Sequence, residues 1–228
     1  MSMISELRNN VSREMETIGL PGIKSDGPHT QNEGRYAEAL IQASLIAGLY
    51  PNLVARKSGD INLSSAANRK AKPHVSSVNS IKSQPLSRKS EIPMGRVEYV
   101  FYHEMIKGPA FFTLRNVNYV FSEVPILLLC GSKFEIREIP DICDEDENEE
   151  DSKTAKASLN EVVVSVDEWI EFRCKKDVAN SLKMMRMRMS EAFLKFAKHG
   201  PRGLTKSDKE AVNGICTFMT QVFYIARK

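Results

Sequence analysis

Residues 97 to 121, VEYVFYHEMIKGPAFFTLRNVNYVF, carry the clearest indication of the fold. The runs VEYVFYHEMI and FFTLRNVNYVF are rich in aromatic and β-branched residues, and a Gly-Pro pair lies between them. Two such runs around a turn predict a β-hairpin. Similar short runs occur before and after it, namely NLVAR (52–56), HVSSVNSI (74–81), ILLLCGSKFEIREI (126–139) and VVVSVDEWIEF (162–172). A series of short strands predicts a barrel or a sandwich.

Apolar residues at steps of three and four predict two helices before this series and two after it. Gly19 ends the first and Gly48 ends the second, while Thr205 and Asp208 have the spacing of a capping box at the start of the fourth. The four apolar stripes are Ile4, Leu7, Val11, Met15 and Ile18; Tyr36, Ala39, Leu40, Ala43, Ile46 and Ala47; Val178, Leu182, Met185, Met189, Phe193 and Phe196; and Val212, Ile215, Met219, Val222 and Phe223.

Charge is distributed unevenly along the chain. The formal net charge is +3, but residues 141–151, DICDEDENEED, hold eight acids and no base, so the remainder carries +11 (3 + 8). Between Arg56 and Arg96, nine Lys and Arg residues stand against two acids, a local net charge of +7 (9 − 2). This segment attracts phosphate, although a solvated loop with ordinary surface lysines has the same composition. The acidic run predicts a disordered insertion over residues 141–160.

The composition disfavours several classes of protein. No apolar run approaches the roughly 20 residues of a transmembrane helix, and the first ten residues carry charge where a signal peptide needs an apolar stretch. We therefore expect no membrane partner and no export. Cys130, Cys143, Cys174 and Cys216 form no CxxC pair and have no His at metal-ligand spacing. This pattern disfavours zinc and disulfides and is typical of the cytoplasm or nucleus.

Catalytic motifs are absent from the sequence. It contains no GxxxxGK[ST] phosphate loop and no GxSxG, HExxH or GxGxxG motif, so a nucleotide-driven motor, a hydrolase, a metalloprotease and a dinucleotide enzyme lack their usual signatures. His103 and Glu104 form an acid/base pair that a small hydrolase would need. Adjacent residues on a strand point to opposite faces, however, so these two converge poorly on one substrate.

Five short motifs follow one another between about residues 36 and 198. They are ALIQASLIAGLYPNLVA (39–55), HVSSVNS (74–80), VFYHEMI (100–106), ILLLCG (126–131) and VDEWIEF (166–172). Their residues and their order resemble those of the OB-fold-containing C-terminal region of DEAH/RHA-family ATP-dependent RNA helicases. The resemblance is to the branch that unwinds RNA and, in some members, G-quadruplexes. Val75, Cys130 and the acidic insertion depart from the family pattern.

The resemblance implies an α+β protein with an OB-fold-like antiparallel β-barrel of about five strands, flanked by N- and C-terminal helices. We place the N-terminal helical segment at 1–50, the barrel at 51–173 and the C-terminal helices at 174–228. In the family such a module forms one wall of the RNA channel. We expect single-stranded or structured RNA as the ligand and helicase RecA-like lobes as partners, in cis or in trans. ATP and Mg belong to those lobes, so we expect no cofactor in this chain.

The resemblance places the HVSSVNS loop near the 3′ part of the bound strand, which makes His74, Ser76, Ser77 and Asn79 candidate RNA contacts. Hydroxyl and imidazole groups can bond to phosphate, sugar or base edges. The alternative is that His74 packs structurally and the serines only form a turn.

Four basic residues are candidates for phosphate contacts, because a groove with basic rims follows a strand without reading its sequence. They are Lys72, Lys82, Lys107 and Arg115, of which the last two flank the predicted hairpin turn GPAFF. The alternative for each of them is an ordinary solvated side chain.

Aromatic residues and methionines can belong either to the core or to a binding surface. Strand alternation favours the core for most of the aromatic residues that could stack on bases. These are Tyr102, Phe111, Phe112, Tyr119 and Phe121, and Trp169 is also expected to be structural. In the stretch KMMRMRM, Met185 and Met189 fit the core stripe of the helix, whereas Met184 and Met187 lie outside it. The second hypothesis is thus a stand-alone protein-interaction module that recruits a partner through its acidic and Met-rich surfaces.

Overall fold

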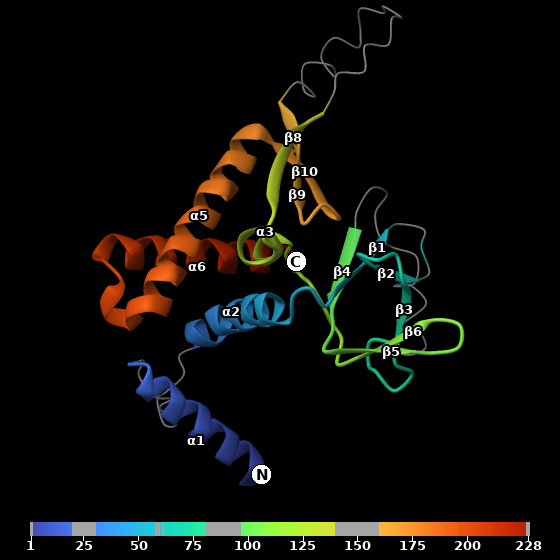
Figure 1. Cartoon of the computed structure of the whole chain (residues 1–228), viewed down its shortest axis with the longest axis horizontal. Coiled ribbons are helices and arrows are strands. Elements are labelled where there is room, and N and C mark those ends of the chain that lie inside the picture. Colours follow the sequence, from blue (N-terminus) through green and yellow to red (C-terminus); the bar gives the residue numbers. More distant parts are fainter. Residues whose placement is uncertain are drawn as a thin grey trace, which may run out of the picture.

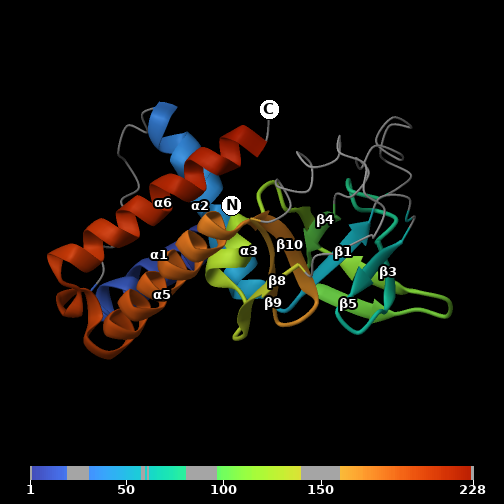
Figure 2. The ribbon, with the colours of Figure 1, turned by 90° about the horizontal axis from the view of Figure 1, so that it is seen from above.

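The computed structural model describes residues 2–19, 31–57, 60, 62–80, 97–139 and 160–226. Most helices gather on one side of the molecule, a seven-stranded sheet lies on the other, and a three-stranded sheet lies between them (Figures 1 and 2). The helices are α1 (Ser2–Thr17), α2 (Gln31–Leu49), α3 (Val124–Leu129), α5 (Lys176–His199) and α6 (Lys206–Ala226), with a 3-10 turn at Gly200–Gly203. Within the described part of the chain, every helix is too short or too polar to span a bilayer.

The larger sheet has the strand order β5-β6-β3-β2-β1-β4-β7. Its strands are β1 (Leu53–Lys57), β2 (Leu63–Ser65), β3 (Lys70–Pro73), β4 (Val97–Phe101), β5 (Glu104–Lys107), β6 (Phe112–Arg115) and β7 (Asn118–Tyr119). All pairs are antiparallel except β3 with β6. Closure into a barrel would require the two edge strands, β5 and β7, to pair, and they do not. The α+β class is therefore confirmed, but the predicted antiparallel barrel is not closed among the described residues.

The smaller sheet corrects the prediction of a single strand over VVVSVDEWIEF. Strands β8 (Phe134–Glu138), β9 (Glu161–Val166) and β10 (Ile170–Lys175) pair antiparallel in the order β10-β9-β8. Val166 faces Ile170 across a turn in which Asp167 and Glu168 have φ angles of 47° and 67°. Glu rarely adopts this left-handed conformation, so the sequence carries no standard turn signal here. The acidic run belongs to the connection between β8 and β9 and lies outside the described residues.

The prediction of a strand for the apolar run ILLL is wrong, because this run forms α3. Short apolar runs do not distinguish a buried strand from a buried helix by their periodicity. Here Pro125 stands in the first turn, where its fixed φ suits a helix start. Ile126, Leu127 and Leu128 are all buried. The helix is therefore covered on more than one face, and its sequence shows no alternation of polar and apolar residues.

Two other predicted β runs are divided in the structure. VEYVFYHEMI forms β4 and β5 with a break at Tyr102 and His103, and HVSSVNSI forms turns from position 75 through 80 after β3. The GPAFF hairpin is confirmed, since Lys107 pairs with Phe112 across β5 and β6. The backbone N–H of Gly108 donates to the Phe111 carbonyl at 3.0 Å and closes that turn.

Two apolar clusters lie on opposite faces of β1 and β4. Along β4, Tyr99 and Phe101 pack into the cluster shared with the helices and the smaller sheet, whereas Val100 packs into a second cluster within the larger sheet. Successive strand residues point to opposite faces, so a strand buried on both sides must be apolar at nearly every position. This requirement explains why VEYVF lacks the usual alternation of polar and apolar residues.

The predicted helices are confirmed, with two corrections to their buried faces. On α5, Leu182 is buried, but Val178 and Phe193 are exposed, and Ala179 and Ala192 are buried in their place. Small alanines allow the helix to approach its neighbours closely, and this rotates the buried stripe. The apolar stripe of α1 is mostly exposed at Ile4, Leu7 and Val11, and Ile18, directly after the helix, is exposed as well.

Two of the five motifs, together with the two residues that directly follow a third, meet at the carboxylate of Asp167. One of its oxygens accepts a hydrogen bond from the Tyr50 hydroxyl at 2.6 Å, and the other accepts the backbone N–H groups of Ser132 at 2.9 Å and Lys133 at 2.8 Å. Burial opposes ionisation of Asp167, but these hydrogen bonds outweigh it and hold its pKa below the ordinary value.

Gly131 and Arg186 complete this contact. Gly131 has φ 72°, and a Cβ there would lie 2.5 Å from Val166 Cγ1, so only glycine fits. The Arg186 guanidinium donates to the carbonyls of Leu127 at 2.9 Å and Cys130 at 2.6 Å, at the C-terminal end of α3. We call these residues the Asp167 junction: Tyr50, Gly131, Ser132, Lys133, Asp167 and Arg186.

Candidate nucleic-acid interface

The backbone of the HVSSVNS loop is held by hydrogen bonds at its start and along its length. β3 ends at Pro73, and the next N–H, that of His74, donates to the Leu114 carbonyl at 2.9 Å and prolongs the pairing with β6. Two turns follow, in which the N–H of Ser77 donates to the His74 carbonyl and the N–H of Ser80 donates to the Ser77 carbonyl, both at 2.9 Å. The loop therefore presents its side chains from a defined backbone.

Hydrogen bonds within the loop orient the His74 ring. Its Nδ1 accepts the backbone N–H of Ser76 at 3.2 Å and lies 2.6 Å from the Ser76 hydroxyl. A backbone N–H can only donate, so Nδ1 is the acceptor in the neutral ring and the proton resides on Nε2. This geometry makes Nε2–H the hydrogen-bond donor that His74 can offer to a ligand.

Asn79 fastens the loop to the neighbouring connection between β6 and β7. Its side-chain Nδ2 donates to the Val117 carbonyl at 2.8 Å, and its backbone N–H donates to the Ser77 hydroxyl at 3.2 Å. The structure thus gives Asn79 a positioning role, and its predicted contact with RNA stays a prediction.

A pocket of about 470 Å³ opens beside this loop. Its lining brings together four of the predicted site residues and three others: His74, Ser76, Ser77, Val78, Arg115, Asn116 and Val117. We call this cavity the His74 pocket. Residues 74 and 115 are far apart in sequence, but β3 and β6 pair in parallel, so their carboxyl ends lie side by side.

Three of the pocket residues were missed by sequence reasoning. Asn116 has φ 51° at the turn between β6 and β7, and Asn is among the residues that tolerate this conformation. Val78 is 84% exposed. The signal available in the sequence was a β-branched apolar residue within a polar loop. Val117 contributes from beneath as part of the apolar cluster of the larger sheet.

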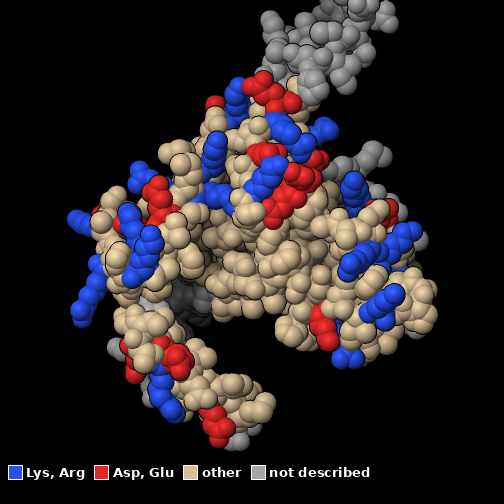
Figure 3. Space-filling model, in the orientation of Figure 1, with Lys and Arg blue, Asp and Glu red and all other residues tan. Residues whose placement is uncertain are grey.

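The basic residues of the prediction are placed unevenly. Arg115 lines the pocket and lies 3.8 Å from the Glu104 carboxylate, with both side chains about half exposed. Water and salt screen such a pair, so the guanidinium stays accessible to phosphate. Lys72 and Lys107 lie nearer the other end of β6, and Lys82 lies outside the described residues. Figure 3 shows several Lys and Arg side chains over the part of the molecule that contains the larger sheet.

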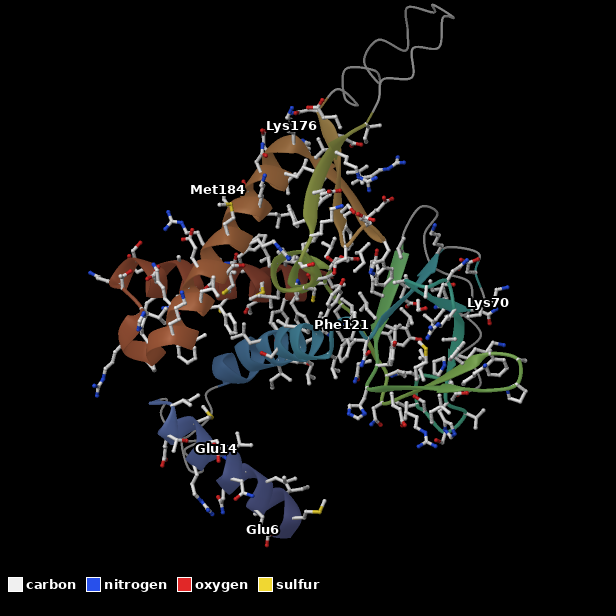
Figure 4. All side chains as sticks on the ribbon, viewed as in Figure 1. Glu6, Glu14, Lys70, Phe121, Lys176 and Met184 are labelled. Carbon is white, nitrogen blue, oxygen red and sulfur yellow. The ribbon has the colours of Figure 1, made fainter. Side chains whose placement is uncertain are left out.

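The aromatic residues that could stack on bases differ in their burial. Tyr102 is buried, and Phe112 and Tyr119 pack against the cluster of the larger sheet. Phe121 (Figure 4) contacts Phe223 edge to face, with ring centroids 5.7 Å apart. The exposed members are Phe111, at the tip of the β5–β6 hairpin, and Phe121, which is 42% exposed despite its contact with Phe223.

Trp169 and His103 are not among the residues that line the pocket, although the His103 backbone N–H donates to the Arg115 carbonyl at 3.2 Å. Trp169 packs against the main core cluster, as expected of a structural residue, although it lies in the β9–β10 turn and not in a strand. His103 precedes β5, and the neighbouring Glu104 carboxylate is directed at Arg115. Within the described residues, no group of three or more His, Cys, Asp or Glu side chains is arranged to hold a metal ion.

The site can therefore offer donors of several kinds within one cavity: an imidazole N–H, serine hydroxyls and a guanidinium. These groups suit an anionic, oxygen-rich ligand such as a phosphodiester. A search of protein-family models found none that matches the chain.

Proposed function

We propose that this chain is an RNA-binding accessory module of a DEAH/RHA-type ATP-dependent RNA helicase, and that it holds single-stranded RNA without the ATPase lobes. The observation that carries the proposal is the His74 pocket, where His74, Ser76 and Arg115 converge beside an exposed valine. Phosphate and sugar contacts from such groups position a strand without reading its sequence.

The proposal includes an OB-fold-like origin for the β region. It is supported by the succession of short strands between an N-terminal helix and C-terminal helices, and by the order of the five motifs. In this proposal the RecA-like lobes, with their ATP and Mg, act in cis or in trans, and the setting is the cytoplasm or nucleus.

The decisive measurement is fluorescence anisotropy with a short, labelled single-stranded RNA. We expect His74→Ala/Ser76→Ala to weaken binding roughly tenfold or more, because hydrogen bonds to a charged group are lost. Lys107→Ala/Arg115→Ala should also weaken binding and should lower the slope of log K against log salt by up to about 1.4, at about 0.7 per lost phosphate contact.

A matched control removes two exposed basic side chains from the outer face of α5, far from the pocket in sequence. Lys183→Ala/Arg188→Ala changes the net charge by the same amount as Lys107→Ala/Arg115→Ala. Circular dichroism of all variants should equal that of the parent. If both pocket variants bind as tightly as the parent, the proposed interface is misplaced.

A second candidate function is recruitment of a protein partner, and the exposed methionines favour it. Met184 and Met187 on α5 are 55% and 49% exposed, and Met184 points away from the core (Figure 4). Flexible thioethers suit an adaptable apolar contact. Salt separates the two functions, because RNA binding weakens steeply as salt rises and an apolar contact is much less sensitive.

A further inference from the structure

Phe111 is the exposed aromatic residue of the β5–β6 hairpin. Its side chain is 41% exposed at the hairpin tip, whereas the next residue, Phe112, turns toward the apolar cluster beneath. Exposure of a large apolar ring in a turn is unfavourable in water. A ligand that covers the ring would therefore remove this apolar surface from water.

The surroundings of Phe111 are basic. The Lys72 ammonium lies 4.8 Å from the Phe111 ring centroid, and the Arg69 guanidinium lies 5.5 Å from the centroid of the neighbouring Phe112. Lys107 stands opposite Phe112 in the hairpin, and Lys70 lies on the adjacent strand β3 (Figure 4). An aromatic face among cations matches the arrangement that binds an unpaired nucleotide, with the base on the ring and its phosphate near the ammonium groups.

Phe111 and the His74 pocket lie at opposite ends of one strand. Arg115, the last residue of β6, lies four residue steps after Phe111, about 13 Å at roughly 3.3 Å per residue. About four nucleotides at a stacked spacing of about 3.4 Å cover this distance, and fewer do so if the strand is extended. One RNA strand that follows β6 can thus reach both places.

We infer that Phe111 is a stacking platform for an unpaired nucleobase, and that it makes the interface selective for single-stranded over double-stranded RNA. A base inside a duplex has neighbours on both faces and cannot stack on the ring. This inference rests on the proposed RNA-binding function and adds the class of ligand to it.

The test compares three ligands of equal phosphate number: oligoadenylate, an abasic ribose-phosphate oligomer and a duplex. The parent protein should bind oligoadenylate roughly 5- to 150-fold more tightly than the abasic oligomer, the range that corresponds to one stacked base. In Phe111→Ala this ratio should fall to about 1, with affinity for the abasic oligomer unchanged, and the preference over duplex should fall in parallel.

Three features make the experiment decisive. The turn is closed by the Phe111 carbonyl, a backbone group that Phe111→Ala leaves in place, so the variant should fold. Phe111→Trp should keep the ratio, and its added fluorescence should be quenched by oligoadenylate and not by the abasic oligomer. Phe193→Ala removes a 67% exposed ring from α5 and should change nothing.

The outcomes separate this inference from the function on which it rests. If the parent binds neither single-stranded ligand, the proposed RNA-binding function fails and the inference fails with it. If the parent binds oligoadenylate and the abasic oligomer equally, or if Phe111→Ala keeps the parent's ratio, RNA binding stands and the stacking platform is wrong.

Discussion

The Asp167 junction and the His74 pocket both include residues from the five motifs, but they use their polar groups differently. At the junction, the Asp167 carboxylate accepts hydrogen bonds from Tyr50, Ser132 and Lys133, all within the protein. At the pocket, His74 and Ser76 bond to each other and line a cavity of about 470 Å³. Motif likeness alone therefore does not separate residues that hold the fold together from residues that line a cavity.

The two regions also differ in what surrounds them. The junction joins the end of α2, the end of α3, α5 and the β9–β10 turn, so its loss would disturb the packing of both sheets against the helices. The pocket lies where strands β3 and β6 end, and there Arg115 and Glu104 are about half exposed. We therefore expect substitutions at the junction to change stability and those at the pocket to change affinity, and the following predictions test this division.

The largest effect on stability is expected at Gly131. Gly131→Ala places a Cβ 2.5 Å from Val166 Cγ1 and 2.9 Å from Asp167 Oδ2, at a φ of 72°. Strain and overpacking should together lower the free energy of unfolding by about 3 kcal/mol or more in urea titrations. The matched control is Gly214→Ala in α6, where a Cβ meets nothing within 4 Å, and it should raise stability by up to about 1 kcal/mol. Equal effects of the two changes would contradict the close packing at the junction.

A smaller loss is expected from Asp167→Asn. The amide cannot accept all the hydrogen bonds that the carboxylate accepts, so the free energy of unfolding should fall by about 1 to 3 kcal/mol. At a temperature where the variant stays folded, its RNA affinity should equal that of the parent. Weaker RNA binding by the folded variant would show that the two regions are coupled.

Asn79 sharpens the comparison because it belongs to the pocket loop but acts through the backbone. Asn79→Ala removes the 2.8 Å bond to the Val117 carbonyl, which should cost about 1 kcal/mol of stability. It should also weaken RNA binding a few-fold in anisotropy, less than His74→Ala/Ser76→Ala. A loss of affinity as large as that of the double variant would make Asn79 a direct contact.

The smallest effect concerns acid stability at the α5–α6 turn, remote from both regions. A hydrogen bond from Lys195, followed by those from Thr205, lowers the pKa of Asp208 from 3.8 to about 2. A lowered pKa in the folded state means that Asp208 contributes stability above about pH 4 and loses it as the pH falls toward 2. Thermal unfolding of Asp208→Asn should thus differ from the parent at pH 6 and converge with it near pH 2. A constant difference across this range would exclude ionisation of Asp208 as the cause.

Several elements could be predicted from the sequence because their signals are local. The helices at α2, α5 and α6 follow from apolar residues at steps of three and four, and Thr205 with Asp208 does form the expected reciprocal bonds at the start of α6. The GPAFF hairpin could be predicted because Gly and Pro are direct signals of a turn. The resemblance pointed to the HVSSVNS loop, and three of its predicted site residues line one pocket together with the predicted Arg115.

What only the tertiary structure decided depends on contacts between distant parts of the chain. Whether ILLL becomes helix or strand is set by the core that covers it, and the turn at Glu168 persists because Asp167 is held by groups from two other segments. The parallel pairing of β3 with β6 brings Arg115 to His74, and the packing of the larger sheet leaves Phe111 outside while Phe112 turns inward. Periodicity shows which face of an element is apolar, whereas long-range pairing determines what that face contacts. This is why the fold class and the HVSSVNS loop could be predicted from the sequence, whereas the pairing that brings residues 115–117 beside that loop could not.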